Sequence, residues 1–236
     1  MFAPNYFVYL FLLAGVILSI ITRKLTVAAA FLGGLTGFLV YTGGGYPGLA
    51  MLVLFFVLGS AATSIGLKKK QQLGFAEADK GRRTAGQVMA NGGVAAILGA
   101  AASFSASQIH ILQLMMAGSL ASATADTLSS ELGTILGRRF YNIITLKKDT
   151  RGLDGVVSLE GTIAGIAGVV LIASVYATWH GWNIEFLWVV LAGIAGNFAD
   201  SVLGATVERK HLIGNNMVNF LNTATGAIVC LLILWV

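Results

Sequence analysis

The sequence predicts an all-α integral membrane protein, because the chain is too apolar for a soluble domain and its cations recur in alternate connections. Of its 236 residues, 56% are hydrophobic and 11% are charged, and the mean hydropathy is +0.82. Soluble domains carry about 25% charged residues. The connections at 42–46, 104–108 and 179–183 carry no Lys or Arg. All 15 Lys and Arg residues lie in four clusters, at 23–24, 68–83, 138–151 and 209–210.

The hydrophobic segments predict about eight transmembrane helices, each near the roughly 20 residues that span a bilayer. Cationic connections stay on the cytoplasmic side of membranes, so we expect the basic loops to be cytoplasmic and both termini extracytoplasmic. The fifth helix is long and is expected to extend past the membrane into the cytoplasm. The predicted helices are 5–22, 25–41, 47–67, 84–103, 109–137, 157–178, 184–206 and 216–235.

An internal repeat is predicted within this single membrane domain. Residues 59–66 (GSAATSIG) resemble 196–204 (GNFADSVLG), and a basic cluster follows each. The similarity predicts that a repeat at about 25–103 recurs at about 157–235, with the helix 109–137 and the loop 138–156 between the copies. The offset of four helices is even, so both copies would point the same way across the membrane, unlike inverted repeats.

The charge and cysteine content limit the partners and cofactors. The Lys and Arg residues that give the net charge of +5 lie in the loop clusters, so they predict attraction to anionic inner-leaflet lipids and anionic soluble substrates rather than to nucleic acid. The single cysteine, Cys230, excludes an internal disulfide and a cysteine-based metal site. The sequence leaves the oligomeric state open.

Three acidic residues lie within predicted helices, where an ionisable group costs about 2.5–3.5 kcal/mol on insertion scales and therefore usually has a function. Asp126 and Asp200 precede Arg138 and Arg209 by two to three helical turns, which puts both in the cytoplasmic half of the bilayer. Glu131 lies nearer the interface. We predict that these three carboxylates form a metal site.

Amide and hydroxyl side chains gather in the same half of the predicted bundle. Such groups also bridge neighbouring membrane helices, at about 0.6 kcal/mol each, and a serine can simply begin a helix. The candidates are Gln87, Asn91, Ser158, Asn219, Asn222 and Thr223.

Carboxylates facing a basic rim fit a divalent metal ion with phosphates, because Mg²⁺ takes one or two carboxylates, phosphate oxygens and water. Lysine and arginine would neutralise the remaining phosphate charge. These cations could instead serve only topology and lipid attraction. The chain has no Walker A loop and no kinase glycine-rich loop, so nucleotide chemistry would be of another kind. The cationic candidates are Lys70, Arg82, Arg83, Lys147 and Lys148.

Five motifs give the chain a resemblance to a known family, the polytopic membrane proteins that include plant and cyanobacterial phytyl-phosphate kinases. An aromatic residue is common in that family where Leu128 stands. The motifs are 82–93 (RRTAGQVMANGG), 125–133 (ADTLSSELG), 152–162 (GLDGVVSLEGT), 199–205 (ADSVLGA) and 218–223 (VNFLNT).

The resemblance implies transfer of a phosphate from a nucleoside triphosphate, with CTP favoured, to an isoprenyl monophosphate. Asp126, Glu131 and Asp200 would then hold Mg²⁺, and Asn91, Asn219 and Asn222 would orient phosphates or metal-bound water. A secondary transporter of a small or lipid-linked anion is an alternative, but it would need a polar path near the midplane. A polyprenol kinase or a nucleotidyl-transferase is another.

Overall fold

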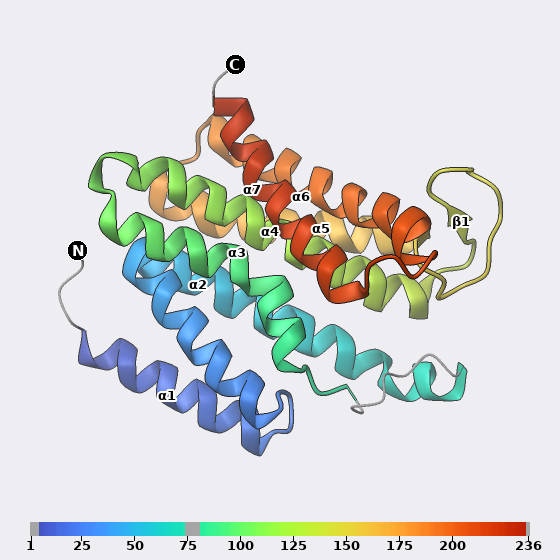
Figure 1. Cartoon of the computed structure of the whole chain (residues 1–236), viewed down its shortest axis with the longest axis horizontal. Helices are drawn as coiled ribbons and strands as arrows, with labels where there is room; N and C mark the ends of the chain where they lie inside the picture. Colours follow the sequence, from blue (N-terminus) through green and yellow to red (C-terminus); the bar gives the residue numbers. More distant parts are fainter. Residues whose placement is uncertain (1–4, 74–80, 235–236) are drawn as a thin grey trace.

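The computed structural model describes residues 5–73 and 81–234, and this part of the chain is almost entirely helical (Figure 1). It confirms the predicted all-α class. The α-helices are α1 (Tyr6–Ile21), α2 (Val27–Leu73), α3 (Ala85–Phe104), α4 (Ile109–Leu136), α5 (Leu159–His180), α6 (Ile184–Leu203) and α7 (Asn215–Leu234). A short 3-10 turn, η1 (Ala106–Gln108), precedes α4, and a π-helical turn, η2 (Gly204–Glu208), continues α6.

Helix α2 consists of two arms, which correspond to the two helices predicted at 25–41 and 47–67. The backbone breaks at Gly45 (φ 61°, ψ −153°), in a region that glycine adopts easily, and Pro47 follows. Lys24 donates to the hydroxyl of Ser64 at 2.6 Å. A straight helix would separate residues so far apart in sequence by about 60 Å. The two arms therefore run antiparallel.

Among the described residues, five segments are long and apolar enough to cross a membrane by length and composition, as expected of a multi-pass membrane protein. Helix α1 has 16 residues and is shorter than these. The eight crossings and the internal repeat stay predictions. The five segments are Val27–Ile65, Ala85–Phe104, Leu159–His180, Ile184–Glu208 and Asn215–Leu234.

Helix α4 is the centre of the bundle and packs against α2, α3, α5, α6 and α7 (Figure 1). Leu114, Met116 and Leu120 are fully buried. The surrounding helices approach closely because small residues face one another. A Cβ on Gly226 of α7 would lie 2.5 Å from the carbonyl oxygen of Gly118, so only glycine allows this separation between the two backbones.

The two ends of the bundle differ. The basic connections lie together at one end of the bundle. There the backbone N–H of Arg83 donates to the carbonyl oxygen of Lys24, and Arg209 forms an ion pair with Asp149. The other end is closed by a polar network that the sequence did not predict. There the buried Glu185 accepts from Tyr176 at 2.9 Å and lies 2.6 Å from Nε2 of His110.

The loop after α4 folds into a small antiparallel hairpin, which was predicted only as a loop. Strands β1 (Tyr141–Asn142) and β2 (Val156–Val157) pair with Tyr141 opposite Val157. Gly155, at φ 70°, packs against the backbone of Ala205 in η2. The hairpin therefore sits over the end of α6.

The close approach of α4 and α7 predicts the effect of one methyl group. Gly226→Ala would place a Cβ against the backbone of Gly118, so we expect destabilisation of about 1–3 kcal/mol. Gly15→Ala is the matched control, because no heavy atom lies within 4 Å of the added Cβ. Thermal unfolding in detergent should show a lower midpoint for Gly226→Ala alone. Equal midpoints would contradict this packing.

Candidate functional site

A cavity of about 570 Å³ lies at the end of the bundle where the basic connections gather. Its wall is built by α2 to α7 together with the hairpin loop. Eight of the side chains predicted for the site line it: Arg83, Gln87, Asn91, Asp126, Glu131, Ser158, Asp200 and Asn219.

Asp126 and Asp200 are brought together by the packing one helical turn below them. Ser122 of α4 donates to the side-chain oxygen of Asn222 on α7, and a Cβ on Gly196 of α6 would collide with the Ser122 hydroxyl. Asp126 and Asp200 lie four residues beyond Ser122 and Gly196, so each is one turn further along its helix. The two carboxyl groups are close enough to interact, and Oδ2 of Asp200 is buried without a hydrogen-bond partner among the described residues.

The cavity is strongly acidic. Besides Asp126, Asp200 and Glu131, it is lined by Asp154 of the hairpin loop and Glu208 of η2. Neither Asp154 nor Glu208 was predicted from the sequence as a site residue. Glu208 stands just before the basic pair at 209–210, and nothing in the sequence signalled the π-helical turn that precedes that pair. Arg83 is the only Lys or Arg lining the cavity among the described residues.

Three helices begin at this cavity. Thr84 and Gln87 form a capping box at the start of α3, and Ser158 caps α5 by accepting from the backbone of Gly161 at 3.2 Å. Asn215, the first residue of α7, also lines the wall. Helix N-termini carry partial positive charge and free N–H groups. The same cavity therefore offers carboxylates to cations and helix ends to phosphates.

Arg83 is fixed by α2. Its guanidinium lies 5.1 Å from the ring centroid of Phe55, and a Cβ on Gly59 would collide with the same group. Its backbone N–H donates to Lys24 at 2.9 Å, and its carbonyl accepts from Thr26 at 3.1 Å. The cation is thus held against one wall, at the start of α3.

Amides complete the polar wall. Asn91 is 7% exposed, and its side-chain oxygen has no hydrogen-bond partner among the described residues. Asn197 accepts from Ser129 at 3.1 Å and lines the cavity beside Asn219. Asn197 was not singled out from the sequence as a site residue, although it lies three residues before Asp200 and shares its helix face.

The other predicted side chains do not line the cavity. Arg82, Lys147 and Lys148 are exposed to solvent. Asn222 and Thr223 are fully buried behind the wall, where Thr223 donates to carbonyl oxygens of α3 and α7. The side chain of Lys70 lies outside the described residues.

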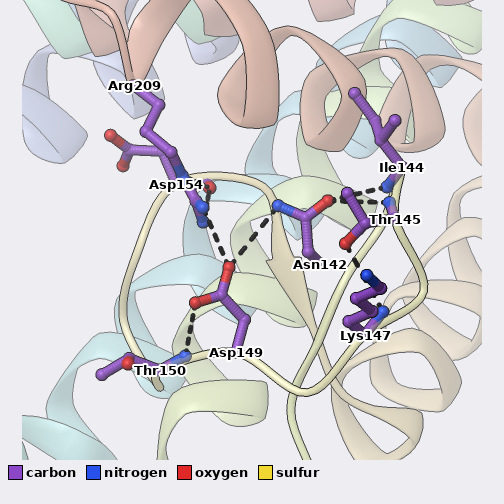
Figure 2. A network of polar contacts seen from close by, with 8 residues as sticks. All are labelled: Asn142, Ile144, Thr145, Lys147, Asp149, Thr150, Asp154 and Arg209. Atoms are coloured by element: carbon purple, nitrogen blue, oxygen red, sulfur yellow. Dashed lines mark hydrogen bonds and ion pairs between the residues drawn. The ribbon is translucent and has the colours of Figure 1, made fainter.

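Arg209 fixes the hairpin loop through the polar contacts that Figure 2 shows. Arg209 donates to Asp149 at 2.9 Å and to the carbonyl oxygen of Asp154 at 2.7 and 3.0 Å. Asn142 accepts from the backbone N–H groups of Ile144 and Thr145 at 3.0 Å. The network holds Asp154 at the rim of the cavity.

The carboxylate of Asp149 stabilises this loop in its charged form. The backbone N–H of Thr150 and then the guanidinium of Arg209 hold the pKa of Asp149 below its usual range. A lowered pKa gives stability that is present above the unfolded value, about 3.9, and lost as the pH falls through the folded value. The loop should therefore stay closed at neutral and mildly acidic pH.

Asp149→Asn should loosen the loop by removing the charge that Arg209 and Thr150 bind. We expect backbone amides of 141–157 to exchange several-fold faster in hydrogen–deuterium exchange at pH 7. Lys147→Gln is the control, because that side chain is exposed. Wild-type protection should be unchanged between pH 8 and pH 5. Equal protection in both variants would contradict the role of Asp149.

The arrangement of the carboxylates that line the cavity determines how a metal ion could bind there. The described residues contain no group of three or more His, Cys, Asp and Glu side chains placed to hold a metal ion, so the three predicted carboxylates do not form a preassembled three-ligand site. The close pair of Asp126 and Asp200 does fit Mg²⁺, which takes one or two carboxylates and completes its shell with water and phosphate. Glu131 would then contact the metal ion through a water molecule.

A polytopic all-α membrane protein with an acidic cavity at one end is thus the class that fold and site define. The family model described as "Integral membrane protein DUF92" matches residues 10–227. The chain belongs to this family, and the resemblance seen in its motifs is confirmed.

The relatives come from three lineages. An uncharacterized membrane protein of Methanocaldococcus jannaschii is 34% identical, over 84% of this chain and 80% of its own length. "Protein VTE6, chloroplastic" of Arabidopsis thaliana is 34% identical, over 87% of this chain and 63% of its own length. An uncharacterized membrane protein of Synechocystis is 32% identical over 83% of this chain and 77% of its own length. No solved structure matches the chain.

Proposed function

We propose that the protein is a membrane-embedded, Mg²⁺-dependent kinase. It transfers the terminal phosphate of a nucleoside triphosphate, CTP being favoured, to an isoprenyl or phytyl monophosphate and yields the diphosphate. One observation carries the proposal: a single cavity is lined by five carboxylates and by residues at the start of three helices. Membership of the family and the chloroplast relative VTE6 support a lipid-related kinase role.

The charge of the cavity is the reason for a divalent cation. Asp126, Glu131, Asp154, Asp200 and Glu208 face a single arginine among the described residues. Triphosphate oxygens would be repelled by such a wall unless cations neutralised it. Asp126 and Asp200 would hold Mg²⁺, and the metal would supply charge neutralisation and alignment of the phosphates.

The phosphate ends would lie against the helix starts. Backbone N–H groups near Ser158 and Gln87 and the guanidinium of Arg83 would bind phosphate oxygens. Asn91 and Asn219 would orient the same oxygens or metal-bound water, and Glu131 would accept from such water. The exposed cations Lys147 and Lys148 would contact the outer part of the nucleotide.

The transfer needs positioning more than a base. A phosphate monoester is largely dianionic at neutral pH, since its second pKa is about 6. One of its oxygens forms a bond to the terminal phosphorus of the nucleotide, and the bond from that phosphorus to the bridging oxygen breaks. The nucleoside diphosphate leaves with the bond's electron pair. The cavity wall would align the two phosphates in line, and Mg²⁺ together with Arg83 would neutralise their charge.

The proposed position in the membrane follows from the basic connections. Eight crossings would place the basic connections and the cavity at the cytoplasmic leaflet and both termini on the other side. Soluble nucleotide would then reach the cavity from the cytoplasm, and the lipid from the leaflet. The basic rim would also attract anionic inner-leaflet lipids.

The transporter alternative needs a polar path between the two ends. The acidic cavity and the network around Glu185 are separated by Leu114, Leu120 and Ile172, all fully buried. A path through this layer would require the bundle to open. The described packing therefore favours an enzyme with one accessible end.

The direct test is a transfer assay on purified protein in detergent with Mg²⁺. γ-Labelled CTP and ATP are offered to phytyl and geranylgeranyl monophosphates and to the corresponding alcohols. Label in a prenyl diphosphate is expected. Label in a prenyl monophosphate, formed from the alcohol, would instead indicate a polyprenol kinase. Release of pyrophosphate would indicate a nucleotidyl-transferase. Folded protein that transfers nothing would contradict the kinase and lead to flux measurements in liposomes.

Asp126→Asn should abolish transfer, by at least about 100-fold in kcat/KM (about 2.7 kcal/mol), because the carboxylate pair would lose one charge. Expression and thermal stability should be retained. Glu160→Gln is the matched control, since Glu160 lies in the first turn of α5 but does not line the cavity. Activity of Asp126→Asn near that of wild type would remove Asp126 from the metal site.

A further inference from the structure

The cavity does not end at its polar wall but continues between α5 and α6. From α5 it is lined by Thr162, Ile166 and Val169, which share one helix face at i, i+4 and i+7. From α6 it is lined by a second such face, formed by Ile194, Asn197, Phe198 and Ser201. We call the space between these two faces the α5–α6 groove.

The α5–α6 groove changes from polar to apolar along its length. Helix α5 runs away from the basic end and α6 runs toward it, so increasing numbers on α5 and decreasing numbers on α6 lead into the membrane. Thr162 and Ser201 lie near Asp200, whereas Val169 and Ile194 lie at the inner end. Val169 is fully buried, and a Cβ on Gly193 would lie 2.9 Å from its side chain. This contact closes the inner end.

The groove also opens sideways. Ile166, Ile194 and Phe198 line the cavity and are 40%, 37% and 57% exposed. In a membrane-spanning bundle such exposed apolar residues face lipid tails. The same three side chains thus border both the polar cavity and the hydrocarbon of the bilayer.

We propose that the α5–α6 groove is a lateral opening through which the tail of a single-chain lipid phosphate leaves the cavity for the bilayer. The ligand is a phosphate monoester of a long apolar alcohol, with its phosphate beside Asp200 and its first tail carbons against Ile166, Ile194 and Phe198. The α5–α6 groove is continuous with the cavity proposed to bind phosphate, and this continuity favours a lipid phosphate as its occupant. An ordinary membrane lipid would not be expected to place its headgroup in that cavity. This inference rests on the proposed function.

The lateral opening has a consequence for substrate choice. Because the groove is open to the bilayer beyond Ile166 and Phe198, it contacts only the part of the tail nearest the phosphate. Long tails of different length should therefore be accepted nearly equally. A short, soluble prenyl phosphate makes few of these contacts and should bind more weakly.

Ile194→Trp tests the opening by filling the groove. We expect kcat/KM for geranylgeranyl monophosphate to fall at least 10-fold, while the KM for CTP stays within 2-fold of wild type. Leu191→Trp is the matched control on α6, because Leu191 is 55% exposed and does not line the cavity. Equal effects of the two substitutions, or none of Ile194→Trp, would overturn the proposal.

A second measurement separates the opening from the kinase reaction. A geranylgeranyl monophosphate with a diazirine near its phosphate is photolysed with wild-type protein in nanodiscs, without nucleotide. Labels should fall on α5 and α6 around Ile166, Ile194 and Phe198, and excess unlabelled geranylgeranyl monophosphate should compete. Labels spread over all lipid-facing helices would mean bulk lipid only and would overturn the opening. Specific labelling without any transfer activity would retain the opening and reject the kinase.

Discussion

The structure depends on holding two carboxylates close together inside a bundle of membrane helices. Asp126 and Asp200 come from α4 and α6, and the close packing of Ser122, Gly196 and Asn222 lies one turn below them. Two carboxylates held close together repel unless a proton or a cation lies between them. Such a pair within a bundle of membrane helices is the main support for the proposal that the site binds a cation.

The rest of the structure contributes partial positive charge at helix N-termini and limits access to the cavity. Helices α3, α5 and α7 begin at the cavity, while α4 and α6 end there, so helix N-termini and carboxylates share the same cavity. The hairpin loop, fixed by Arg209 and Asp149, covers one side. At the far end, the network of Glu185, Tyr176 and His110 joins α4, α5 and α6. Together these features leave a polar approach at the basic end and an apolar one between α5 and α6.

Much of this arrangement was predictable, because membrane helices are read from hydrophobic length and the placement of cations. The predicted ranges lie within about three residues of the observed helices, including the two arms of α2, where Gly45 and Pro47 mark the break, except that α2 continues past the predicted residue 67 to Leu73. Asp126 and Asp200 stood out because carboxylates are costly in such segments. Sequence did not reveal Glu208 or Asp154, which a π-helical turn and a hairpin bring to the cavity, because both depend on contacts between distant segments.

Basic residues were the least predictable. A cation in a cytoplasmic loop serves topology whether or not it also binds substrate, so sequence could not distinguish Arg83, which lines the cavity, from Arg82, which is exposed. The difference comes from Gly59 and Phe55 of α2, which receive the Arg83 guanidinium. Arg209 likewise fixes the hairpin loop to the bundle.

The central claim, that the Asp126–Asp200 pair binds a divalent cation, is tested most directly by Mn²⁺ binding followed by electron paramagnetic resonance on purified protein. Wild-type protein should bind Mn²⁺ in competition with Mg²⁺, and CTP should tighten the binding. Asp200→Asn, folded as judged by its melting midpoint, should weaken the binding at least 10-fold. Mn²⁺ binding that is absent from wild type, or equal in Asp200→Asn, would contradict the account.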